Sequence, residues 1–95
     1  MKFVEVDNVF EALGSNKAEA HTHRLRSDLM MTVEDIITEK NLSHEEAAKN
    51  FGVSLETIND LLTGRWRNFT IDELIAMLAR ADVLVELSIP AKIAA

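Results

Sequence analysis

The chain of 95 residues contains no cysteine, one proline and three glycines. Without cysteine it forms no disulfide framework, no thiolate zinc site and no cysteine nucleophile. No apolar run approaches the roughly 20 residues that span a bilayer. The acidic opening, MKFVEVDNVF, is too short in apolar length for a signal peptide. We therefore expect a cytoplasmic protein with no membrane partner.

Basic residues are also scarce. Ten Lys and Arg residues stand against sixteen Asp and Glu residues, which gives a net charge of −6. This balance disfavours non-specific adhesion to nucleic acid but still permits a local basic patch. Apolar residues make up 47% and charged residues 27% of the chain, as is typical of globular proteins. At this length they predict one domain with a modest core.

The apolar residues of the first half recur at helical spacing. Asn8 is expected to cap a short helix, VFEAL, that ends at Gly14. A long helix is then predicted from about Lys17 to Lys40, because its apolar residues recur every three or four positions along one face. Those apolar residues are Leu25, Leu29, Val33, Ile36 and Ile37.

Three further helices are expected from their capping residues. The stretches 43–46 and 70–73 each match a capping box, in which a Ser or Thr and a Glu three residues later exchange hydrogen bonds. Between them, Ser54 is expected to cap a helix that ends at Gly64. The residues predicted to face inward from these helices are Ala47, Ala48, Phe51, Ile58, Leu61, Leu62, Ile71, Leu74, Ile75, Leu78 and Ala81.

The end of the chain has a different pattern. Residues 83–89, VLVELSI, are rich in β-branched residues, and their second half alternates apolar with polar side chains. A period of two predicts a strand. A single strand after several helices has no partner in its own chain, and pairing with the same strand of a second copy satisfies its backbone groups. The residues expected to form this homodimer contact are Val83, Val85, Leu87 and Ile89.

Residues 43–64 have the spacing of a helix-turn-helix motif. Two steeply crossing helices need a small residue in the first helix, a residue tolerating positive φ at the turn, and apolar anchors after it. The residues at these positions are Ala48, Gly52, Val53, Ile58 and Leu61. Five matches at the right offsets predict this motif strongly.

At these positions the chain resembles the XRE (Cro/C1-type, lambda-repressor-like) family, and more narrowly its HigA-like antitoxin branch. The resembling stretches are NVFEALG (8–14), LRSDLMMTVEDIITEKNLSHEEAA (25–48), FGVSLETINDLLTG (51–64) and FTIDELIAMLARADVLVEL (69–87). The resemblance implies an all-α, lambda-repressor-like bundle of about five helices, with one C-terminal β-strand that pairs across a dimer. The parts expected are an N-terminal arm with a short helix (1–16), a helix-turn-helix DNA-binding domain (17–82) and a dimerisation strand and tail (83–95).

The same resemblance implies a function. Members of the family bind double-stranded DNA at palindromic operators, with the second motif helix in the major groove. Members of the HigA-like branch often pair with a RelE- or HigB-type toxin and repress their own operon. We therefore expect a dimeric, sequence-specific transcriptional repressor of the antitoxin type, which needs no cofactor. Two alternatives are a protein-interaction module, whose acidic face binds a basic partner such as a toxin, and a regulator with no toxin.

The DNA-binding roles fall on residues that match the family motif. The base-reading side of the second motif helix is implied to include an adenine contact from Asn59, a cytosine contact from Glu56 and a thymine-methyl contact from Leu55. His44, at the start of the helix before the turn, is implied to lie near a phosphate. The complete set of expected DNA-binding residues is His44, Ser54, Leu55, Glu56, Thr57, Asn59, Asp60, Thr63, Arg65 and Arg67.

Competing interpretations of single residues favour ordinary structural roles. His21 and His23 lie two apart and point in different directions on a helix, so they are not expected to chelate a metal together. Glu56 and Asp60 lie on one face, but no third ligand or nucleophile–base pair supports an enzyme. Trp66 either stacks on a DNA sugar or, more in line with its type, clamps its loop onto the helix that follows. Met30 and Met31 are expected to serve core or dimer packing.

Overall fold

The computed structural model describes residues 15–89 of the chain, so the expected VFEAL helix and its Gly14 stop lie outside the described residues. The described part contains four α-helices and one short 3-10 helix. They are α1 (Ser15–Glu39), α2 (His44–Phe51), α3 (Leu55–Leu62), η2 (Trp66–Asn68) and α4 (Ile71–Arg80). The long helix and the three capped helices predicted from the sequence are confirmed, with bounds that differ by at most a few residues.

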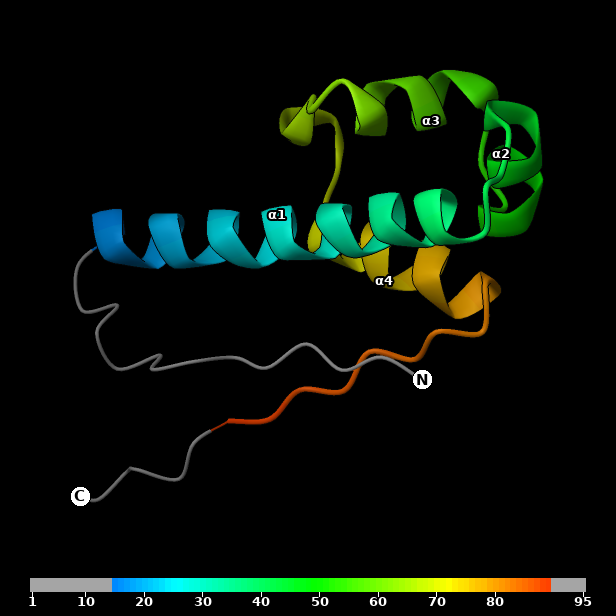
Figure 1. Cartoon of the computed structure of the whole chain (residues 1–95). Coiled ribbons are helices and arrows are strands. Elements are labelled where there is room, and N and C mark those ends of the chain that lie inside the picture. The colour runs from blue at the N-terminus through cyan, green and yellow to red at the C-terminus, as the bar shows by residue number, and fades with distance from the viewer. Residues whose placement is uncertain (1–14, 90–95) are drawn as a thin grey trace.

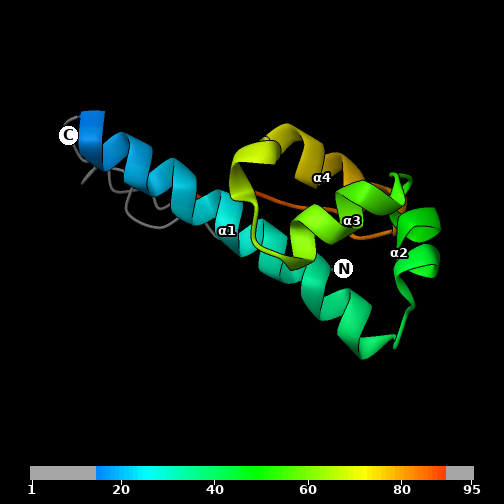
Figure 2. The same ribbon diagram turned by 90° about the horizontal axis from the view of Figure 1, so that it is seen from above.

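Helix α1 is the axis around which the other helices are arranged (Figure 1). Helices α3 and α4 both lie along the same side of its carboxyl-terminal half (Figure 2), and α2 closes the end of the bundle beside them. Seen from the α3 side, the amino-terminal half of α1 projects beyond the rest of the bundle (Figure 2). Helix α1 therefore has a packed half and a projecting half.

Local hydrogen bonds fix where the helices begin. In α2 the Ser43 hydroxyl accepts from the Glu46 backbone N–H at 3.1 Å, and the Glu46 carboxylate accepts from the Ser43 N–H at 2.8 Å. The same reciprocal pair joins Thr70 and Glu73 at the start of α4. Both capping boxes predicted from the sequence are confirmed.

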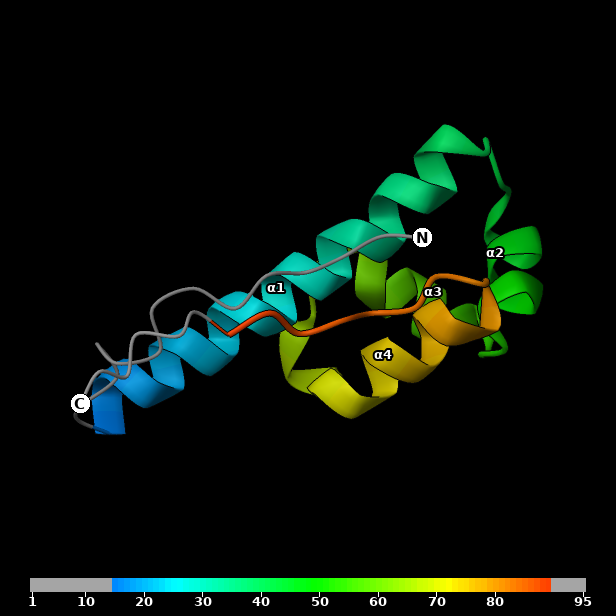
Figure 3. The ribbon, with the colours of Figure 1, turned by 90° about the horizontal axis from the view of Figure 1, so that it is seen from below.

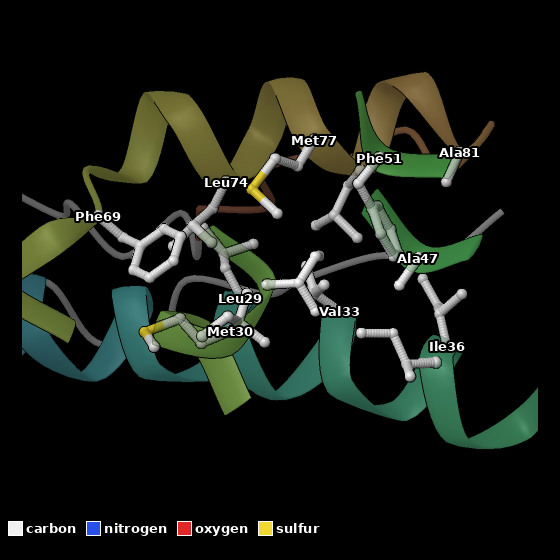
Figure 4. Close-up of a cluster of buried hydrophobic side chains, with 14 residues drawn as sticks. Leu29, Met30, Val33, Ile36, Ala47, Phe51, Phe69, Leu74, Met77 and Ala81 are labelled. Atoms are coloured by element: carbon white, nitrogen blue, oxygen red, sulfur yellow. The ribbon is translucent and has the colours of Figure 1, made fainter. Parts of the chain in front are cut away.

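The core lies between α1, α2, α3 and α4 (Figure 4). Its largest fully buried side chains are Phe51, Ile58, Leu74, Leu78 and Val33. The predicted inward faces are confirmed at most positions, although Leu25, Ala48, Leu62, Ile71 and Ile75 are only partly buried. Met30 joins the core, whereas its neighbour Met31 is 55% exposed. Within the described ranges, no helix is both long and apolar enough to cross a bilayer.

Residues 83–89 form no strand in the described chain, where a strand had been predicted. They run as an extended segment along the α1 and α4 side of the bundle (Figure 3). Val83 and Val85 pack against the core, while Leu84, Leu87 and Ile89 stay exposed. The physical reason is that a ladder needs a neighbouring strand, and none occurs among residues 15–89.

The turn between α2 and α3 depends on Gly52. Its φ of 69° is left-handed, and its N–H points back to the carbonyls of Ala48 and Lys49. A Cβ at this position would lie 2.6 Å from Cδ of Arg80. The Arg80 guanidinium in turn donates from Nη1 to the Phe51 carbonyl at 3.3 Å, which ties α4 to the end of α2. Gly64 also has a positive φ, 76°, but its Cβ would meet nothing within 4 Å.

The two glycines therefore form a matched pair for a stability test. Gly64→Ala should cost about 1 kcal/mol, because it adds only left-handed backbone strain. Gly52→Ala should cost roughly 1 kcal/mol more, since Arg80 must also move and loosen its bond to Phe51. Urea unfolding followed by circular dichroism measures both. Equal losses in the two variants would show that the Arg80 contact does not stabilise the turn.

Candidate nucleic-acid interface

Helix α3 is anchored by one face and exposed on the other. Ile58 and Leu61 are 0% and 3% exposed, and the partly buried Leu62 packs beside them. This anchoring fixes the rotation of the helix about its axis. The residues that it leaves on the outer side are Ser54, Leu55, Glu56, Asn59 and Thr63, which are exposed, and Thr57 and Asp60, which are half-buried. The seven positions of α3 expected to face a DNA groove thus lie on or beside one surface.

The hydroxyl groups of that surface already have partners. The Ser54 hydroxyl accepts from the Thr57 N–H at 3.1 Å, and the two side-chain oxygens lie 2.9 Å apart. Thr63 donates its hydroxyl hydrogen to the Asn59 carbonyl, with an oxygen–oxygen distance of 2.8 Å. These bonds define the two ends of α3, so the primary role of the three hydroxyls in the free protein is capping.

Asp60 is held by two residues from the loop after α3. Its carboxylate lies 3.9 Å from Nε of Arg65 and accepts from the Asn68 amide nitrogen at 3.2 Å. The pair with Arg65 is weak because Arg65 is 66% exposed. These contacts turn the Asp60 carboxylate toward the loop and offset part of its negative charge. Sequence reasoning missed Asn68, since a contact across eight residues has no periodic signal.

Trp66 joins the loop after α3 to α1. Its ring meets the ring of His23 edge-on at 4.3 Å between centroids, and the guanidinium carbons of Arg67 and Arg26 lie 4.5 Å and 5.3 Å from its centroid. Trp66 therefore has a structural role, but these contacts join its loop to α1, whereas the sequence predicts that Trp66 holds the loop on the helix that follows. Trp66 is half-buried in this position, which favours its structural role over a free stacking platform.

The remaining predicted positions lie around α3. Arg65 and Arg67 follow it directly and are exposed, and His44 is the exposed first residue of α2. The start of α2 adds backbone N–H groups and the positive end of a helix dipole to this surface. Within residues 15–89, no group of three or more His, Asp or Glu side chains could hold a metal ion. These exposed side chains and the start of α2 can contact the surface of another molecule.

The contribution of the Ser54 cap to the stability of α3 can be tested with two substitutions. Ser54→Ala should lower the free energy of unfolding by about 1 kcal/mol, because the Thr57 N–H loses its acceptor. Ser54→Gly should cost only a few tenths, since glycine leaves that N–H open to water. Both variants remove the hydroxyl, so urea denaturation of the pair isolates the cap. A similar loss in the two would indicate that the hydroxyl acts in some other way.

Comparison with known proteins completes the description of this surface. A family model described as a helix-turn-helix domain matches residues 9–90. Searches of characterised proteins and of solved structures each return no significant match. The matched range contains α1 to α4 and the whole motif, with the second motif helix exposed as a helix that enters a DNA groove must be. The chain therefore belongs to the helix-turn-helix domain family, a DNA-binding fold.

Proposed function

We propose that the protein is a dimeric, sequence-specific DNA-binding repressor whose α3 lies in the major groove. The observation that carries the proposal is the exposed outer face of α3, held in a fixed rotation by Ile58 and Leu61. A fixed rotation matters because base edges are distinguished by donor and acceptor positions a few ångströms apart. A helix free to rotate would not hold its side chains in register with them.

Three side chains on this face suit base reading. Asn59 presents an amide that matches the N6 and N7 edge of adenine, Glu56 accepts from N4 of cytosine, and Leu55 meets a thymine methyl group. Leu55 is 43% exposed, a large apolar side chain on an otherwise polar face. Its burial against a methyl group in the groove would remove it from water.

Attraction to the phosphate backbone comes from the surroundings of α3. Residues 54–64 carry two acids and no base, whereas Arg65 and Arg67 follow immediately. The starts of α2 and α3 add N–H groups that favour anions. With so few cations, binding should weaken with salt at a log–log slope of about −3 to −5 for a dimer, at about −0.9 for each neutralised phosphate.

A dimer is part of this proposal, because paired half-sites need two copies of α3 about one DNA turn apart. The segment 83–89 supports it. Two of the predicted dimer residues, Val83 and Val85, are partly buried against the chain's own core. The other two, Leu87 and Ile89, are 64% and 61% exposed. Pairing with the same segment of a second copy would cover these apolar side chains and satisfy the backbone.

The antitoxin role rests on the resemblance to the HigA-like branch. In that reading the repressor controls its own operon and binds a RelE- or HigB-type toxin. The second candidate is a protein-interaction module with weak or no DNA binding, which the acidic outer side of α3, with Glu56 and Asp60, favours. Co-expression with the product of the neighbouring gene separates the two. If the protein forms a stable complex with that gene product but binds no DNA, the result supports the interaction module and contradicts the repressor function.

Two substitutions test DNA reading directly. Arg65→Ala should weaken binding to all sequences alike and reduce the salt slope by about 1 per protomer, because it removes a phosphate contact. Asn59→Ala should instead relax the choice of base at one position of each half-site, by about 1–3 kcal/mol of discrimination. Fluorescence anisotropy with DNA from upstream of the protein's own gene measures both. If the wild-type protein forms no sequence-dependent complex even at low salt, the repressor function fails.

The dimer contact has its own matched pair of variants. Leu87→Glu places a charge among the exposed apolar side chains of the predicted pairing face and should yield a monomer. Leu84→Glu changes another exposed leucine that points the other way along an extended segment, so the dimer should persist. Light scattering gives the mass of each. A dimer that survives Leu87→Glu would mean that this segment is not the interface.

A further inference from the structure

Two arginines from distant parts of the chain are ordered on one indole ring. Arg67 in η2 lies 4.5 Å from the centroid of Trp66, and Arg26 in α1 lies 5.3 Å from it. His23 meets the same ring edge-on. We name these four residues the Trp66 cluster. The cluster joins Arg26 of α1 to the loop that follows α3.

No ion pair among the described residues balances the positive charge of this cluster, although Glu19 lines the cleft beside it. Neither Arg26 nor Arg67 makes an ion pair within the described part of the chain, where Arg65 is the arginine paired with Asp60. Nε of Arg26 is buried without a hydrogen-bond acceptor, and so is Nδ1 of His23. Buried donors normally have partners. Two like charges on one ring also repel each other, and an anion beside the guanidiniums would reduce that repulsion.

The cluster belongs to a basic region in an acidic protein. Residues 15–27 carry three basic and one acidic side chain, and residues 65–68 carry two basic ones. Together these segments have a charge of +4. The described residues 15–89 hold eight Lys and Arg against thirteen Asp and Glu, a net charge of −5, so the other described residues carry −9. Such separation concentrates a positive field around these two segments.

The position of the cluster points to the kind of anion. It lies where η2 meets the projecting half of α1, just beyond the end of α3, and this half of α1 is visible from the α3 side (Figure 2). A cleft of about 630 Å³ opens between α1 and Trp66, with Arg26, His23 and Thr22 among its lining residues. A duplex that holds α3 in its groove carries a row of phosphates past each end of that helix.

We propose that Arg26 and Arg67, ordered on Trp66, bind a DNA backbone phosphate that flanks the base pairs read by α3. This inference rests on the proposed DNA binding and adds α1, which is outside the helix-turn-helix motif, to the interface. Stacking on the indole orders both guanidiniums before DNA arrives, so less side-chain entropy is lost on binding. Each protomer of a dimer gains one such contact.

The test compares Arg26→Gln with Lys40→Gln, which removes an exposed cation directly after the other end of α1. Salt titrations followed by anisotropy are expected to show a slope smaller by about 1 per protomer for Arg26→Gln. Its affinity should be about tenfold weaker for all sequences alike. Arg26→Lys, which keeps the charge, should keep most of the slope. Equal effects of the glutamine variants at positions 26 and 40 would assign the loss to net charge and overturn the inference.

A second measurement uses the unaltered protein, so it does not depend on the folding of a variant. Methylphosphonate linkages, which carry no charge, are placed one at a time along the duplex. One linkage outside the base-read segment should weaken the wild-type protein more than Arg26→Gln, in which only Arg67 is left to contact that phosphate. Trp66, the single tryptophan, should change its fluorescence on binding the unmodified duplex.

The outcomes separate this inference from the function on which it rests. If the wild-type protein binds no DNA, both fail. If it binds DNA and no flanking linkage affects it, or Arg26→Gln binds as the wild type does, only the phosphate contact fails. The Trp66 cluster would then be available to bind another anionic group, such as one on an acidic protein surface.

Discussion

The left-handed backbone at Gly52 is the constraint on which the arrangement depends. It lets the chain turn within a few residues, so that Phe51 at the end of α2 and Ile58 in α3 enter the same core. A residue with a side chain would strain this backbone and displace Arg80, whose guanidinium holds the carbonyl end of α2. Four elements are thereby fixed at one point: α2, the turn, α3 and α4.

This junction explains why α3 is available as a surface. The helix has only eight residues, too few to be stable alone in water. It persists because Ser54 caps its start, Gly64 ends it in a left-handed turn, and its apolar side is buried. The same burial forces the remaining residues outward. Exposure of Asn59 and Glu56 is thus a consequence of core packing, and it positions them without any contact of their own.

The distribution of charge follows the same division. The acids of α3 lie on its outer side, and the loop after it partly offsets the charge of Asp60 through the cation Arg65 and the amide of Asn68. Next to this loop, the Trp66 ring brings together the guanidiniums of Arg67 in η2 and Arg26 in α1. An acidic protein thereby has one basic region, next to its least basic helix.

The sequence was sufficient for everything set by local spacing. Helix periods, the two capping boxes and the turn glycine each involve residues at most four apart, and the structure confirms them. Contacts between distant segments carried no such signal. The grip of Trp66 on α1 depends on how η2 meets the projecting half of that helix, and the Asn68 contact depends on the curvature of the loop. Residues 83–89 have the alternation of a strand, but a ladder also requires a neighbour, which no local pattern supplies.

An acidic reading helix is a physical disadvantage for affinity, but it acts differently on specificity. Repulsion between Glu56 and the phosphates weakens specific and non-specific complexes alike, so the ratio between them is unchanged. In the groove, however, the Glu56 carboxylate finds donors only at cytosine N4 and adenine N6 and meets acceptor atoms at guanine or thymine. A wrong base leaves a desolvated carboxylate without a partner, which costs more than a neutral side chain would lose. In the repressor proposed above, Glu56 would therefore contribute mainly by rejecting wrong sequences, while the cations beside α3 would bind the phosphates of any sequence.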